Sequence, residues 1–158
     1  MYIGLNNVNN IFRSDNMNKD IEFLNYIAQN SKMGIDTLTL IIKDIDGNEF
    51  KTILLDQLQE YMKIYDKCTE LLHSMNSNVE DFNALQKVST YMATKFNMAK
   101  DDSHSHIAEM IIQGSTMGVT DITKKINQYI DSDEKIQILA KKLLKIEENN
   151  IEEMKRYL

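Results

Sequence analysis

The sequence contains no proline, no tryptophan and only five glycines. Proline and glycine are the residues that most often interrupt helices and form tight turns, so their scarcity disfavours a β-rich fold. With 42% hydrophobic and 27% charged residues, the composition is typical of a globular protein. A length of 158 residues fits one domain with one core. We therefore predict a single all-α domain.

Other absences bear on function. One cysteine, Cys68, excludes an internal disulfide and is expected to be a small buried group on a helix. A net charge of −6 offers no basic stripe for nucleic acid, so no nucleic-acid partner is expected. No apolar run approaches the roughly 18 residues that span a membrane, and MYIGLNNVNN lacks the pattern of a signal peptide. We expect a cytoplasmic protein without membrane contacts.

Apolar residues recur at spacings of three and four along four long segments, which predicts four helices in residues 18–158. Residues 1–17 are polar and rich in asparagine, and we predict a mobile N-terminal tail there. The predicted helices run from Asn18 or Asp20 to about Ile45, from Glu49 to Ser74, from Asp102 or Ser103 to about Ile130, and from Asp131 to the C-terminus.

The segments that follow the first and second predicted helices carry capping and turn signals. Ser77 and Glu80 have the spacing of a capping box, which predicts an additional helix from Val79 to about Met98 between the second and third helices. At Asp46-Gly47-Asn48 we expect a left-handed glycine to end the first helix. The flanking LTLII and FKTILL are also compatible with a β-hairpin, but the corresponding ITKKINQYI lacks strand character, so the helical interpretation is favoured.

An internal repeat suggests how these helices are arranged. Ser115 to Ile126 reads STMGVTDITKKI and resembles Ser31 to Ile42, SKMGIDTLTLII, at an offset of 115 − 31 = 84 residues. A repeat of half the chain predicts an antiparallel four-helix bundle of two related helix pairs. Gly34 and Gly118 correspond in the repeat, and Gly114 lies on the same face as Gly118. Because glycine weakens a helix, we expect close approach of the first and third helices there.

This arrangement, with an extra helix in its central connection, resembles the ferritin-like superfamily. It is similar to small bacterial members such as the spore coat protein F-like proteins, which would imply a structural or stress-linked role, with possible association with spores. In the superfamily each helix pair supplies one Glu and a Glu-x-x-His to a two-metal site. The equivalent interior positions here are Gln29, Met62, Tyr65, Gln113, Glu147 and Asn150.

Only Glu147 matches the ligand motif of the family, so the resemblance implies a degenerate site and no cofactor. A neutral polar cluster is expected in place of the metals. The alternative is an iron or manganese oxidoreductase or metal-storage protein. For that alternative, the side chains of metal-binding type are His104, His106, Glu109, Glu147 and Glu148.

No nucleophile motif or glycine-rich phosphate loop occurs, so we predict no catalytic residues. Our first expectation is a non-enzymatic bundle with a structural or protein-interaction role, acting through a protein partner or by forming a homodimer. A second alternative, besides the metalloprotein, is a small-molecule binder whose pocket lies between the first and third helices near the glutamines.

Overall fold

A computed structural model describes residues 3–80 and 103–158, with side chains described from residue 14 onward in these ranges. This part of the chain is helical and contains no strand, which confirms the prediction of an all-α protein. LTLII and FKTILL lie in helices, so the β-hairpin alternative is wrong. The helices are α1 (Ile3–Ile42), α2 (Glu49–Ser74), α4 (His104–Gln128), α5 (Glu134–Met154) and the short 3₁₀ helix η1 (Lys155–Tyr157).

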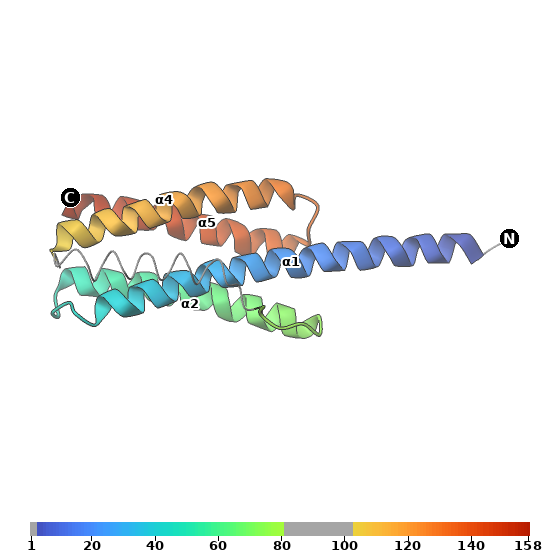
Figure 1. Ribbon diagram of the computed structural model, residues 1–158, viewed down its shortest axis with the longest axis horizontal. Helices are drawn as coiled ribbons and strands as arrows, with labels where there is room; N and C mark the ends of the chain where they lie inside the picture. Colours follow the sequence, from blue (N-terminus) through green and yellow to red (C-terminus); the bar gives the residue numbers. More distant parts are fainter. Residues whose placement is uncertain (1–2, 81–102) are drawn as a thin grey trace.

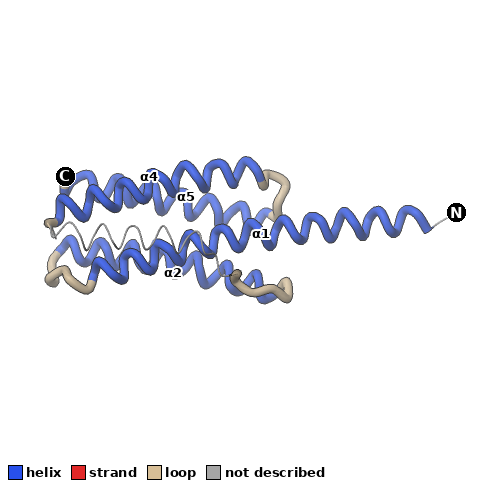
Figure 2. The backbone as a smooth tube through the Cα atoms, viewed as in Figure 1, coloured by secondary structure: helices blue, strands red, loops and turns tan. Residues whose placement is uncertain are grey.

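The helices form two hairpins that lie side by side (Figure 1). α1 and α2 make the lower hairpin in this view, and α4 and α5 make the upper one, with the chain reversing direction within each. The end of α2 and the start of α4 lie at opposite ends of the molecule (Figure 2). The end of α2 at Ser74 is therefore far from the start of α4 at His104.

Side chains cap the starts of three helices, as the sequence pattern indicates. Asn48 accepts a hydrogen bond from the backbone N–H of Lys51 at 3.0 Å, which fixes the start of α2 at Glu49. The Ser103 hydroxyl caps α4, and Asp133 caps α5, two residues after the predicted Asp131. These oxygens satisfy N–H groups that have no partner within the helix.

The first connection does not use a left-handed glycine. No glycine in the described residues has a positive φ angle, so the prediction for Gly47 is wrong. The residue with positive φ is Asn76, at 56°, just after α2. Asparagine tolerates this conformation better than most residues.

α1 begins at Ile3, so residues 3–17 are helical, whereas the first helix was predicted to begin only at Asn18 or Asp20. Extending a helix that has already nucleated costs little, and no proline interrupts this stretch. Figure 1 shows the N-terminal part of α1 projecting beyond the other helices. Residues 14–19 are exposed accordingly.

The core consists of apolar side chains that both hairpins bury. Cys68 belongs to it, and burial raises the pKa of its thiol to about 12. Residues 81–98 of the predicted additional helix lie outside the described residues, and residues 77–80 are not helical. The largest fully buried side chains are Phe23, Leu24, Ile27, Ile41, Phe50, Leu54, Leu72, Ile107, Ile122, Ile136, Leu143 and Met154.

Candidate functional site

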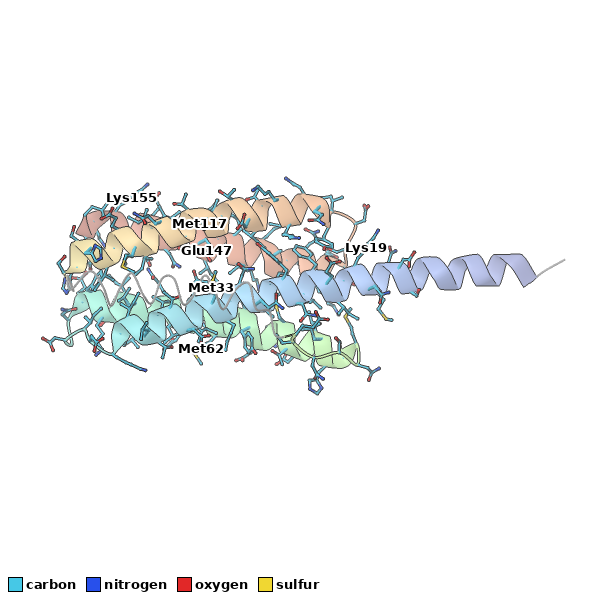
Figure 3. The ribbon with its side chains drawn as sticks, in the orientation of Figure 1. Lys19, Met33, Met62, Met117, Glu147 and Lys155 are labelled. Atoms are coloured by element: carbon cyan, nitrogen blue, oxygen red, sulfur yellow. The ribbon has the colours of Figure 1, made fainter. Side chains whose placement is uncertain are left out.

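A cleft of about 360 Å³ separates the two hairpins. Its walls are formed by α1 and α4, and the buried polar side chains at its base come from α2, α5 and, at Ser115, α4. Figure 3 shows Glu147 between Met33 of α1 and Met117 of α4, with Met62 farther away. Most of the lining is apolar, and the polar side chains at the base are Gln57, Tyr61, Ser115, Glu147 and Asn150.

Two glycines allow large side chains to reach this base. A Cβ atom on Gly34 would lie 2.8 to 2.9 Å from three carbons of the Tyr61 ring. A Cβ atom on Gly118 would lie 2.8 Å from Cδ of Glu147. Each glycine therefore accommodates a side chain from the other helix of its own hairpin. We predicted that close approach of the first and third helices would explain these glycines. The contacts at Gly34 and Gly118 instead join α1 to α2 and α4 to α5.

Glu147 is the acidic group at the base of the cleft and is only 7% exposed. Burial raises the pKa of its carboxyl to about 7, because the charged form loses hydration. Hydrogen bonds from the hydroxyls of Ser115 and Tyr61 act in the opposite direction. The carboxyl therefore changes its charge near neutral pH.

Tyr61 connects Glu147 to the amide of Asn150. The Asn150 side-chain N–H donates to the Tyr61 hydroxyl oxygen at 3.0 Å, and the Tyr61 hydroxyl hydrogen-bonds to Glu147. Burial raises the pKa of Tyr61 well above its usual value, and the nearby Glu147 charge acts in the same direction. Tyr61 therefore stays neutral and acts as a hydrogen-bond donor to Glu147.

Gln57 presents a second acceptor at the base. Its side chain is 3% exposed, and its Nε2 donates to Oε2 of Glu153 at 2.8 Å. Its buried Oε1 has no hydrogen-bond partner among the residues that the structure describes. A buried acceptor without a partner is costly, which makes this oxygen a candidate contact for a bound molecule.

The mouth of the cleft carries one charge of each sign. Lys125 donates to Oε1 of Gln128 at 3.1 Å and lies 5.3 Å from the centroid of the Tyr26 ring. Asp121 is exposed and forms a 3.7 Å ion pair with Lys124. Both charges are therefore engaged by neighbouring residues on α4.

The structure places the predicted interior positions in different environments. Glu147 and Asn150 are buried. Met62 is 46% exposed and Gln113 is also exposed, so the prediction that they point inward is wrong. The remaining two are half-buried: Gln29 donates to the backbone oxygen of Glu80 at 2.8 Å, and Tyr65 packs against the core.

Helix geometry explains these errors. Gln29 and Gln113 each precede a cleft glycine by five residues, which rotates them about 140° away from it at about 100° per residue. Met62 follows Tyr61 by one residue and is turned about 100° from the cleft. The base side chains that this reasoning missed are Gln57, Tyr61 and Ser115, although Ser115 begins the repeated segment of the second half.

The alternative metal ligands do not come together. The His104 ring stacks on Phe50 with centroids 4.4 Å apart, Glu109 accepts from Gln113, and Glu148 lies 3.8 Å from Lys145. The described ranges contain no group of three or more His, Cys, Asp or Glu side chains placed to hold a metal. A single carboxyl among amides and hydroxyls does not fit a two-metal centre, which needs several carboxylates to balance its charge.

Comparisons with protein-family models, with curated proteins and with solved structures found no match for this chain. Among the helices in the described part of the chain, none is both long and apolar enough to cross a membrane.

Proposed function

We propose that this chain is a non-enzymatic, ferritin-like helical bundle that binds a small molecule in the cleft between its hairpins. The cleft itself carries this proposal. Its volume of about 360 Å³ and its apolar walls with a few converging polar groups are typical of small-molecule sites. The ferritin-like relationship is supported by the two hairpins, the long connection between them and the repeat around Gly34 and Gly118.

The polar groups at the base favour recognition over catalysis. In the described residues they comprise one carboxyl, two hydroxyls and two amides, and no histidine lines the cleft. Glu147 accepts from the hydroxyls of Tyr61 and Ser115 at once, so neither hydroxyl stands apart as a nucleophile with a base of its own.

Methionine methyl groups allow a direct test. Met33, Met110 and Met117 line the cleft, whereas Met17 and Met62 are exposed outside it. We expect small aromatic fragments to shift the ¹³C-methyl NMR signals of the three lining methionines and to leave the other two unchanged. Equal shifts at Met62, or no shift with any fragment at millimolar concentration, would overturn the proposal.

Occupation of the cleft by residues 81–102 of the same chain is the alternative that the test must distinguish. They join α2 to α4, and their sequence carries an apolar stripe that ends in Tyr91, Met92 and Phe96. The same labelled sample distinguishes this outcome. Nuclear Overhauser contacts from the Met33 and Met117 methyls to residues 81–102 in the free protein would mean that the chain fills its own cleft, which contradicts the proposal.

Exposed apolar side chains on α2 favour self-association as a second function. Leu55 is 40% and Met62 is 46% exposed, and they are seven residues apart on one face. Leu58 and Tyr65, on the same face, are half-buried. Such a stripe is typical of a helix that pairs with a second copy. Sedimentation equilibrium should show a dimer that the double substitution Leu55→Lys, Met62→Lys converts to a monomer; a monomeric parent protein would contradict this.

A further inference from the structure

We propose that the cleft takes a protonated amine on an apolar body, with the Glu147 carboxylate and Oε1 of Gln57 as the acceptors of its N–H groups. This inference rests on the proposed small-molecule function and specifies the chemistry of the ligand. It begins from two residues with acceptor atoms, Gln57 and Glu147, which line the same cleft and are both more than nine-tenths buried.

The orientation of the Gln57 amide follows from its partner. Nε2 faces the Glu153 carboxylate, which only accepts hydrogen bonds, so Oε1 must be the atom left over. That oxygen is buried without a partner in the described part of the chain. A ligand that fits this position must therefore supply a donor.

The charge at the base leads to the same requirement. No lysine, arginine or histidine in the described ranges forms an ion pair with Glu147. The neighbouring side chains hydrogen-bond to it but carry no positive charge. A buried carboxylate is expensive unless it is paired, so a ligand cation would supply what the protein lacks. A carboxylate or phosphate ligand would add a like charge instead.

The apolar walls of the cleft indicate that the rest of the ligand is apolar. Leu38 and Ile41 of α1 and Ile111 of α4 line the cleft together with Met33 and Met117. Methionine adapts to irregular apolar shapes, which suits an apolar body of the ligand. An ammonium offers three donors, enough for both acceptors, whereas an alcohol offers one.

Binding should be linked to the protonation of Glu147. The other charged and titratable groups that line the cleft are Tyr61 on α2, Tyr26 on α1, and Asp121 and Lys125 on α4. The pKa of Tyr26 is raised to about 12 and that of Tyr61 well above its usual value, so neither tyrosine ionises near neutral pH. A cation would favour the carboxylate form, so binding below pH 7 should release a proton.

The test compares benzylamine, benzyl alcohol and benzoate, which share one apolar body. Isothermal titration calorimetry at pH 7 should show benzylamine binding about tenfold more tightly than the alcohol, and benzoate binding most weakly. The Glu147→Gln variant should bind amine and alcohol within about twofold of each other. Gln57→Met should weaken amine binding by a smaller factor.

Proton release provides a measurement that needs no variant. At pH 6 the apparent binding enthalpy of benzylamine to the parent protein should depend on the ionisation enthalpy of the buffer. The slope of this dependence should show that protons are released from the protein to the buffer on binding. Equal affinity for amine and alcohol, or no buffer dependence, would overturn the amine assignment and leave the cleft as a site for neutral ligands. If none of the three compounds shifts the lining methionine methyls, both proposals fail.

Discussion

In each of the two hairpins a glycine leaves room for a large side chain of the neighbouring helix, but the two side chains differ. In the first hairpin Gly34 leaves room for the ring of Tyr61, and in the second Gly118 leaves room for the carboxyl of Glu147. Both buried side chains meet at the base of one cleft, where Tyr61 hydrogen-bonds to Glu147. The repeated element is thus the space beside a glycine.

The difference between the hairpins lies in the chemistry of the side chain in that space. An aromatic ring gains from burial, whereas a carboxyl loses hydration and has its pKa raised. The space beside each of two equivalent glycines therefore holds an aromatic ring in the first hairpin and an ionisable carboxyl in the second. Substitutions at these positions should separate the effects of the two side chains.

The substitution Glu147→Gln, which removes the buried carboxyl, should have the largest effect on how the free energy of unfolding depends on pH. Its pKa of about 7 lies above the ordinary 4.5, so the folded state binds the proton more tightly than the unfolded state. This contribution is fully present below pH 4.5 and is lost as pH rises to 7, by on the order of 3 kcal/mol.

Urea denaturation of both proteins at pH 4.5 and pH 8 measures this effect. The free energy of unfolding of the parent should fall between the two pH values relative to that of the variant. Taking the difference at each pH removes the contributions of other titrating groups. Parallel pH profiles for the two proteins would contradict the burial of this carboxyl.

Filling the space in the first hairpin by Gly34→Ala should have the next largest effect. The new Cβ would lie 2.8 Å from a buried ring that packs against the core, so the ring or the helix must move. Overpacking of this kind costs about 1–3 kcal/mol, partly offset by the better helix propensity of alanine. Thermal and urea denaturation should show a net loss of about 1–2 kcal/mol. A stabilised variant would show that the ring does not pack against Gly34.

Tyr61→Phe keeps the ring and removes the hydroxyl that joins the two hairpins. Asn150 loses its acceptor at 3.0 Å, and Glu147 loses a donor. The free energy of unfolding should decrease by about 1 kcal/mol at pH 8. The pKa of Glu147 should rise further, since a hydrogen bond to its charged form is lost, and an unchanged titration by NMR would exclude this contact.

Gly118→Ala should have a smaller effect on stability than Gly34→Ala. The Cβ would meet Cδ and Oε1 of Glu147, at the far end of a side chain that can rotate away. We expect a change of less than about 1 kcal/mol in unfolding, because the gain in helix propensity offsets the displacement. The same substitution should disturb amine binding strongly. Unchanged benzylamine affinity would show that the position of Glu147 does not matter.

Gly47→Ala is the matched control for both helical glycines. A Cβ there would have no atom within 4 Å, and the residue does not have a positive φ angle. Its effect on stability should lie within about 0.5 kcal/mol, and ligand binding should be unchanged. A larger loss in this control would mean that the Gly34 result reflects general sensitivity to alanine.

Much of the fold could be predicted from the sequence because local signals determine it. α2 has the predicted bounds, Glu49 to Ser74, and apolar spacing of three and four identified the helices. The helical state of residues 3–17 was missed, because asparagine-rich sequence shows little apolar period and helix extension needs none.

The site was predictable only in part. Glu147 and Asn150 were identified from the spacing of the ferritin-like motif, and both are buried. Tyr61 was missed as a site residue, because the motif spacing pointed to Met62, one residue away. A shift of one residue rotates a side chain by about 100°, and the register between packed helices depends on tertiary contacts that no local pattern contains.

The most direct measurement is the titration of the Glu147 carboxyl by ¹³C NMR, assigned by comparison with the Glu147→Gln variant. The structure predicts a pKa of about 7, because the carboxyl is buried at the base of the cleft with hydroxyl donors and forms no ion pair with a described residue. Addition of benzylamine should lower that pKa. An ordinary value near 4.5 would show a solvated carboxyl and would contradict the assignment of Glu147 as the recognition group of the cleft.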